Sequence, residues 1–216
     1  EEFGAWIREV RSTCEIIVSE KRPVPLYQHM IVGEDIFDLY APTGKGKLNP
    51  ELVAATRDSG MRGGRGSRSW NREVRVRRES RPSTLISLDR ARLLPAITFI
   101  FSRAGCEDAV RQILSTRITL TTRSEAAEIE SYVDEVIALL PPEDAIVLGA
   151  EAWKRGLMRG IAAHHAGMLP LMKESVEHLF SRGLVKMVYA TETLALGINM
   201  PARTVVIESL TKWNGS

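Results

Sequence analysis

Three short runs of the sequence combine hydroxyl, guanidinium, imidazole and glycine groups in a way that suits contact with phosphate. The first is Ser102-Arg103, which follows an apolar run and precedes a helical pattern. The N–H groups at a helix start and an Arg side chain both bind phosphate or carboxylate readily. A simpler interpretation stays open, in which Ser102 only caps the helix and Arg103 is only solvated.

The second run is His164-His165-Ala166-Gly167, at the end of another apolar segment. Neighbouring residues of a strand point to opposite faces, so the two histidines are poorly placed to share a metal ion. No cysteine or carboxylate cluster stands beside them to complete a zinc site, and we expect no metal site in the chain. We expect one of the two imidazoles in the core or at a hinge and the other within reach of a ligand, and Gly167 allows a backbone to approach closely.

The third run, from Thr191 to Pro201, is the most informative. It begins where an apolar segment ends, and its first three residues, Thr191, Glu192 and Thr193, fit a helix start that contacts a backbone phosphate. Gly197 and Asn199 fit an approach to a sugar or phosphate through backbone and amide groups. Taken alone, the run also reads as a capped helix followed by a turn.

Other chemistry has little support in the sequence. No nucleophile elbow, paired metal-binding histidine motif or Rossmann glycine triplet is present. The run Gly44-Lys45-Gly46-Lys47 lacks the spacing of a P-loop and follows no strand pattern. Cys14 and Cys106 form neither a disulfide framework nor a zinc spacing, which favours a reducing, cytoplasmic compartment.

The elements that must position the three runs alternate between strand and helix. Apolar, β-favouring segments predict strands at 16–18, 27–32, 96–101, 161–164, 185–190 and 204–207. Helical spacing and capping signals predict helices near 3–10, after Ser102, from Thr122 to Leu140, from Pro142 to about Gly160, and from Pro170 to Gly183. Such alternation requires a parallel sheet with right-handed crossovers. Because these sheets bind ligands beyond the carboxyl ends of their strands, all three runs fall where a site is expected.

A strongly basic segment interrupts this pattern. From Ala41 to Arg90 there are 12 Lys or Arg and 5 Asp or Glu, a balance of +7, whereas the 216-residue chain carries only +2. Apart from a short helix near Pro50–Thr56, the chain from about Ala41 to Leu88 lacks apolar periodicity and is expected to be a mobile insertion. It would be either a solvated linker or a tether for nucleic acid. The longest apolar stretch, Leu93–Phe101, is too short to cross a bilayer, so no membrane partner is expected.

The segments Phe99–Arg103, His164–Pro170 and Ala190–Val206 closely resemble the superkiller-type helicases, a DExH-box family of superfamily two that includes exosome-associated RNA helicases. The resemblance implies an α/β, RecA-like second lobe with a parallel sheet, helices on both faces and a disordered basic insertion, truncated before motif VI. It divides the chain into the end of a first lobe with an interlobe linker (1–33), the insertion (34–92) and the lobe itself (93–216).

The resemblance also implies residue roles. The residues expected to contact nucleic acid are Ser102, Arg103, His165, Ala166, Gly167, Thr191, Glu192 and Thr193, and those expected to face the nucleotide cleft are Gly197 and Asn199. ATP and Mg²⁺ would be bound mainly by a first lobe outside this chain, so the fragment alone is expected to be inactive. The expected function is ATP-dependent unwinding of, or 3′-to-5′ translocation along, single-stranded or partly duplex RNA, with DNA as the alternative substrate. The rival interpretation is a non-catalytic module that binds nucleic acid through its basic insertion.

Overall fold

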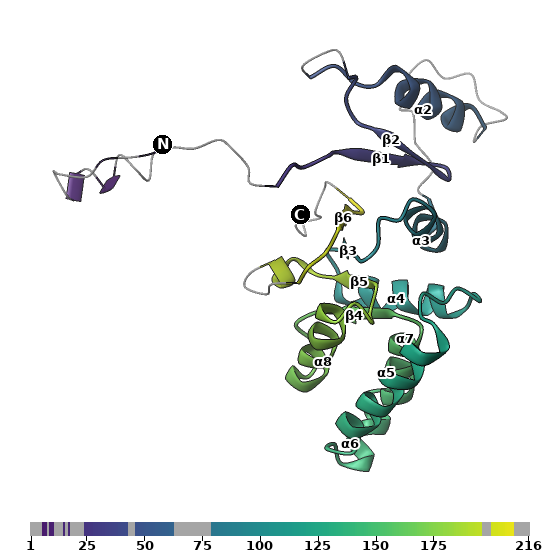
Figure 1. Cartoon of the computed structure of the whole chain (residues 1–216), viewed down its shortest axis with the longest axis vertical. Helices are drawn as coiled ribbons and strands as arrows, with labels where there is room; N and C mark the ends of the chain where they lie inside the picture. Colours follow the sequence, from purple (N-terminus) through teal and green to yellow (C-terminus); the bar gives the residue numbers. More distant parts are fainter. Residues whose placement is uncertain are drawn as a thin grey trace, which may run out of the picture.

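A four-stranded parallel sheet, in the order β4-β5-β3-β6, lies at the centre of the computed structural model (Figure 1). The structure describes residues 6–7, 9–10, 15, 17, 24–42, 46–62, 79–195 and 200–209. The strands are β3 (Ala96–Phe99), β4 (Ile161–His164), β5 (Met187–Ala190) and β6 (Thr204–Ile207). All four occupy segments in which the sequence predicted strands.

Successive residues of β3, β4 and β5 enter two different hydrophobic clusters, one on each face of the sheet. Ile97, Ala162 and Val188 belong to one cluster, and their chain neighbours Ala96, Ala163 and Tyr189 belong to the other. The first cluster is completed by α5 (Arg123–Ile137), α7 (Ala150–Met158) and α8 (Pro170–Ser181). The second is completed by α3 (Arg81–Arg90) and α4 (Arg103–Leu114). Helices therefore cover both faces of a parallel sheet, as a RecA-like lobe requires.

Capping chemistry sets several helix boundaries. Thr122 and Glu125 form the predicted capping box at the start of α5, each side chain accepting from the other residue's backbone N–H. The prediction of a single helix from Pro142 to about Gly160 is wrong, because the structure has two helices there, α6 (Pro142–Val147) and α7. Gly149 separates them at φ +66°, a left-handed conformation that an α-helix cannot continue through.

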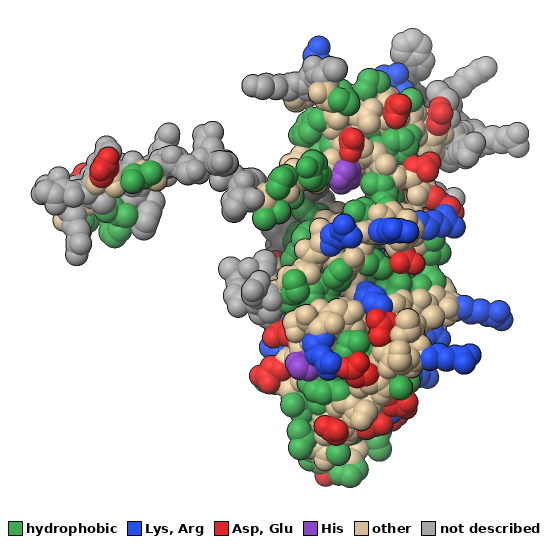
Figure 2. Space-filling model, in the orientation of Figure 1, with side chains coloured by type: hydrophobic (Ala, Val, Ile, Leu, Met, Phe, Trp, Pro, Cys, Tyr) green, Lys and Arg blue, Asp and Glu red, His purple; other side chains and the backbone are tan. Residues whose placement is uncertain are grey.

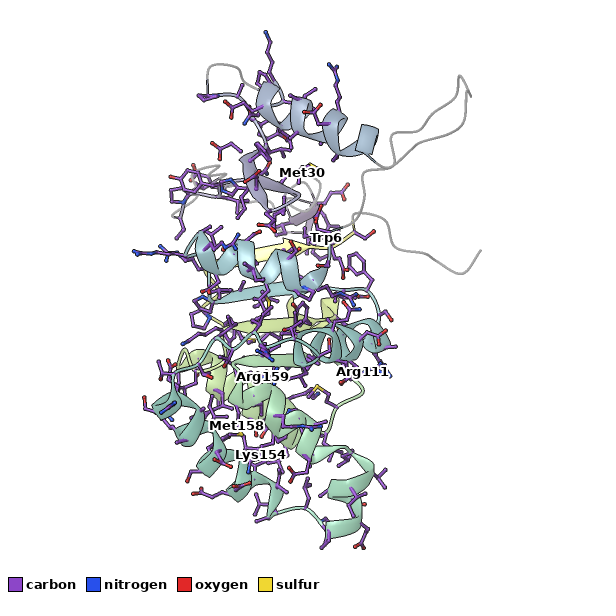
Figure 3. The ribbon with its side chains drawn as sticks, turned by 90° about the vertical axis from the view of Figure 1, so that its right-hand side faces the viewer. Trp6, Met30, Arg111, Lys154, Met158 and Arg159 are labelled. Carbon is purple, nitrogen blue, oxygen red and sulfur yellow. The ribbon has the colours of Figure 1, made fainter. Side chains whose placement is uncertain are left out.

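Two residues labelled in Figure 3, Lys154 of α7 and Arg159 just after it, connect this helix to its neighbours. Lys154 forms ion pairs with Glu130 and Asp134 of α5, at 3.2 and 2.7 Å. Just past the helix end, Arg159 donates to the carbonyls of Leu114 and Thr116, which follow α4. These links hold the edge strand β4, which comes next in the chain, between α4 and α7.

Part of the segment expected to be irregular is helical. Helix α2 (Pro50–Arg62) extends the short helix expected near Pro50–Thr56. Helix α3 contradicts the expectation of irregular chain up to Leu88, because Leu85 and Leu88 are at most 2% exposed in the core. Three apolar residues in a ten-residue helix give a weak periodic signal, and the burial of the two leucines is decided by the sheet that they pack against. The Gly/Arg-rich run at 63–78, on which the predicted disorder chiefly rests, lies outside the described residues.

A β-hairpin docks on α3. Strands β1 (His29–Val32) and β2 (Asp35–Asp38) pair antiparallel around a turn in which Gly33 has φ +68°. Ile31 and Ile36 pack against the α3 cluster, and the Ser87 hydroxyl donates to the Glu34 carbonyl at 2.8 Å. The hairpin straddles the proposed boundary at residue 33, and the three-part division of the chain stays a prediction. Of the helix expected at 3–10, residues 6–7 and 9–10 are described and are helical, whereas only residue 17 of the strand expected at 16–18 is described, and it is not in a strand.

The surface in Figure 2 shows Lys and Arg side chains gathered at the level of α3 and α4, whereas the end formed by α5 and α6 shows mainly acidic and hydrophobic groups. At that end Leu139, Ile146 and Val147 are 72–85% exposed. No helix among the described residues is both long enough and apolar enough to cross a membrane.

Candidate nucleic-acid interface

The ends of three neighbouring strands form one edge, and this edge is the candidate interface. The register places Phe99, Ala190 and His164 in a single row across β3, β5 and β4. Just beyond the row, the Ile100 N–H donates to the Ala190 carbonyl at 2.8 Å, and the Thr191 N–H donates to the His164 carbonyl at 3.2 Å. The three runs singled out in the sequence therefore begin side by side.

The start of α4 presents Ser102 and Arg103 at this edge. Ser102 is the N-cap, and its hydroxyl oxygen accepts the Gly105 N–H at 3.2 Å. Arg103 is exposed and forms no ion pair with any other residue that the structure describes. The capping role of Ser102 is confirmed, and ligand contact by either residue stays a prediction.

Arg103 lies against the turn that follows β4. A Cβ atom added to Gly167 would be 3.4 Å from Arg103 Cδ and 3.2 Å from His165 Nδ1. The second distance is tighter than ordinary van der Waals contact, so a side chain at this position would crowd the His165 ring, whereas the first distance shows that Arg103 lies next to the turn. Ala166 and Gly167 are exposed, whereas the His165 side chain is 8% exposed. The structure thus brings Arg103 together with two exposed residues of the predicted site.

The two histidines bind carboxylates of helices on opposite faces of the sheet, which confirms the prediction that they point apart. His164 Nε2 lies 2.7 Å from Glu177 of α8, and His165 Nε2 lies 2.9 Å from Glu107 of α4. His165 Nδ1 also accepts the Gly167 N–H at 3.1 Å, whereas the buried His164 Nδ1 has no hydrogen-bond partner among the described residues. Both rings are buried, so a ligand at this edge meets the His165–Gly167 turn before it meets the His165 imidazole.

The run after β5 enters a short 3-10 helix, η1 (Glu192–Ala195). Thr191 is 8% exposed, and its carbonyl accepts the Leu194 N–H at 3.1 Å. Glu192 is exposed, and nothing is described for the Thr193 side chain. Gly197 and Asn199, the predicted nucleotide contacts, lie outside the described residues.

Two buried groups beneath this edge are held in their neutral forms. Burial, with Glu107 as the next cause, raises the pKa of the Cys106 thiol to about 12. Burial also raises the pKa of the Tyr189 hydroxyl well above its ordinary value. Neither group therefore supplies an anion near neutral pH.

A pocket of about 280 Å³ adjoins the interface beside edge strand β4, between α4 and α7. Its walls include Glu107, His165 and Gly167 on the interface side and Trp153 and Met172 on the other. Among the residues that the structure describes, no group of three or more His, Cys, Asp or Glu could hold a metal ion.

Glu107 is the residue of this interface that the sequence did not reveal. It lies four positions after Arg103, so the two side chains share one face of α4. That spacing is visible in the sequence, but no sequence signal indicates that this face of α4 contacts the end of β4.

A parallel sheet covered by helices on both faces, with polar groups gathered beyond the carboxyl ends of its strands, matches the architecture of a RecA-like lobe. The chain belongs to the superkiller-type helicase family. It is 47% identical over 230 residues to "Probable helicase HelY" of Mycobacterium leprae, covering 100% of this chain and 25% of the relative. It is 39% identical to the chloroplastic "DExH-box ATP-dependent RNA helicase DExH15" of Arabidopsis thaliana and 36% identical to "Superkiller complex protein 2" of Homo sapiens, again over its whole length.

The chain spans a quarter or less of the length of these relatives, 25%, 21% and 18% respectively. No family model matches the chain.

Proposed function

We propose that this chain is the second RecA-like lobe of an ATP-dependent helicase that moves 3′-to-5′ on single-stranded or partly duplex nucleic acid, with RNA favoured over DNA. The observation that carries the proposal is the gathering of Arg103, the Ala166–Gly167 turn and Thr191 at the ends of three neighbouring strands. The preference for RNA rests on relatives whose names describe an RNA helicase and a superkiller complex protein.

The groups at this edge suit the backbone of a strand rather than its bases. Arg103 supplies a charged donor, and the starts of α4 and η1 supply N–H groups that favour phosphate. Contacts of this kind fix the position of the strand without reading its sequence. A lobe that holds the backbone in this way allows a helicase to step along any sequence.

ATP and Mg²⁺ are part of the proposal for the whole protein. The residues of this chain proposed to face the nucleotide are Gly197 and Asn199, and the remaining groups would come from the first lobe. When bound, ATP supplies the free energy that drives the two lobes through closing and opening. The 216-residue chain on its own is expected to show no ATPase activity, with or without RNA.

The experiment is an unwinding assay with the whole protein and labelled duplexes that carry a single-stranded tail at either the 3′ or the 5′ end, made of RNA or of DNA. The proposal expects release of the labelled strand only with ATP and Mg²⁺, only from 3′-tailed duplexes, and faster with RNA. Release from 5′-tailed duplexes alone would contradict the direction. Binding of the duplexes without any ATP-dependent release would instead favour the non-catalytic binding module.

A further inference from the structure

The His165–Gly167 turn is held by a side chain that accepts a hydrogen bond from the backbone. Gly167 N–H donates to His165 Nδ1 at 3.1 Å, and the Met168 N–H donates to the His165 carbonyl at 3.1 Å. A backbone N–H can only donate, so Nδ1 must carry no proton for the first of these bonds to exist. The proton of the neutral ring is therefore on Nε2.

Glu107 is the group that accepts the hydrogen bond from this Nε2–H. Its Oε1 lies 2.9 Å from His165 Nε2, and an ionised carboxylate can only accept. The carboxylate therefore favours the tautomer in which Nδ1 is free for Gly167. A carboxylate that fixes a histidine tautomer in this way also fixes the orientation of the ring.

The bond crosses from a helix to the end of a strand at the proposed interface. Glu107 lies one helical turn beyond Arg103, whose side chain packs against Gly167. One carboxylate thus ties the exposed turn to the helix that begins with Ser102 and Arg103. The neighbouring pair, His164 and Glu177, lacks this arrangement, since the buried His164 Nδ1 has no hydrogen-bond partner among the described residues.

We propose that Glu107 is a positioning residue for nucleic-acid binding: by accepting from His165 Nε2, it selects the tautomer that holds the Gly167 N–H and keeps the turn against Arg103. This inference rests on the proposed function, because it requires the turn to lie on the bound strand. Glu107 itself does not contact the strand, since a carboxylate beside a phosphate would be repelled.

The sign of the effect separates positioning from simple electrostatics. Glu107 is an exposed anion, its side chain 51% accessible, on the face that would meet a polyanion. If it acted only through its charge, removing that charge would tighten strand binding. If it positions the turn, removing the acceptor weakens strand binding in spite of the lost negative charge.

The test measures the affinity of the whole protein for a fluorescent poly-uridine 20-mer, with two substitutions of nearly equal shape. Glu107→Met removes the acceptor and should weaken binding about tenfold, the loss expected for one charge-assisted hydrogen bond. Glu107→Gln keeps an acceptor oxygen and should bind within about threefold of the unaltered protein. Glu177→Met removes the matching bond on the other face of the sheet and should leave the affinity unchanged.

Repeating the Glu107 substitution in a His165 variant shows whether Glu107 acts through His165. In His165→Asn, the Asn oxygen can accept the N–H two residues on, as in an Asx turn, without help from Glu107. Adding Glu107→Met in that background should change the affinity less than about twofold. A tenfold loss in both backgrounds would overturn the proposal, because Glu107 would then act by some path other than His165.

The remaining outcomes are equally decisive. Tighter strand binding by Glu107→Met or Glu107→Gln would overturn the proposal and favour a purely electrostatic role for Glu107. If the Met variant does not fold, the affinity of the Gln variant makes this decision by itself. Arg103→Ala separates this inference from the proposed function. If Arg103→Ala weakens binding and Glu107→Met does not, only the positioning role fails. If neither substitution weakens binding, the interface itself is wrong.

Discussion

Arg81 at the start of α3 and Glu208 just after β6 form a two-pronged ion pair, in which Nε and Nη2 each donate to a carboxylate oxygen at 3.2 Å. The two residues are 127 positions apart, and their side chains are only 17% and 15% exposed. Breaking a mostly buried pair leaves a charge without its partner, so such a bond constrains the two elements that it joins. Helix α3 is accordingly an integral part of the lobe, although the sequence placed it in a mobile insertion.

The first prediction tests this assignment through the core contact of α3. Leu85→Ala should lower the free energy of unfolding by about 2–5 kcal/mol, because the side chain is fully buried and its removal leaves a cavity. Leu139→Ala makes the same chemical change where the side chain is 72% exposed, and should cost less than about 0.5 kcal/mol. Urea unfolding followed by circular dichroism measures both. If both substitutions lowered the free energy of unfolding by the same small amount, α3 would belong to the insertion and not to the lobe.

The second prediction concerns the opposite end of the sheet. Lys186 Nζ donates to both carboxylate oxygens of Glu125, at 2.9 and 3.0 Å, and this bond is the largest cause that lowers the pKa of Glu125. A carboxyl whose pKa is lower in the folded state stabilises that state above its ordinary pKa of 4.5, and the contribution is lost as pH falls through the folded value. Glu125→Gln should therefore lower the melting temperature at pH 7 and flatten its decline below about pH 4.5.

Glu135→Gln, on the exposed face of the same helix, is the control for this experiment. Its melting temperature should follow that of the unaltered chain from pH 7 to pH 3. A decline in the Glu125→Gln variant as steep as that of the unaltered chain would show that Lys186 and Glu125 do not form a stabilising pair in solution.

The third prediction separates two roles of Thr191. Its position between β5 and η1 fits both a cap and a phosphate contact, and Thr191→Val keeps the shape while deleting the hydroxyl. If the hydroxyl contacts the nucleic-acid strand in the whole protein, the substitution should make the free energy of binding less favourable by about 1 kcal/mol. If it serves only the local fold, the melting temperature should fall with no change in affinity. Parallel binding and melting measurements distinguish the two roles, and unchanged affinity would remove Thr191 from the interface.

The sequence predicts those parts of the fold that local physics determines. The apolar runs that form β3, β4 and β5 can be read directly, because strands covered on both faces need continuous apolar residues. The Thr122–Glu125 capping box likewise depends on four consecutive residues. These local signals are sufficient by themselves to place Ser102, His165 and Thr191 at or just beyond strand ends.

The parts that the sequence does not predict depend on contacts between distant elements. Helix α3 contributes only Leu85 and Leu88 as fully packed apolar residues, and its place is decided by the sheet and by Glu208. The role of Glu107 depends on the approach of α4 to the end of β4, which no spacing within α4 encodes. The break at Gly149 was not predicted because helix-favouring residues resume directly after it, and the left-handed φ of Gly149 is what separates α6 from α7.

The most direct test of the account is the salt dependence of strand binding by the whole protein in two matched variants. Arg103 and Arg123 are each the first residue of a helix, after the N-caps Ser102 and Thr122. Arg103 lies at the carboxyl ends of the strands, whereas α5 begins near Gly160 and Lys186, at their amino ends. Only Arg103 should therefore contact the bound nucleic-acid strand.

Titrating a labelled single strand at several salt concentrations gives both the affinity and the slope of its logarithm against the logarithm of salt. For Arg103→Ala, the account predicts a loss of roughly 1.5–3 kcal/mol and a slope smaller by about one, the same for every strand sequence, because one phosphate contact is lost. Arg123→Ala should leave both quantities unchanged. An unchanged affinity and slope for Arg103→Ala, or equal effects of the two substitutions, would contradict the assignment of this edge as the nucleic-acid interface.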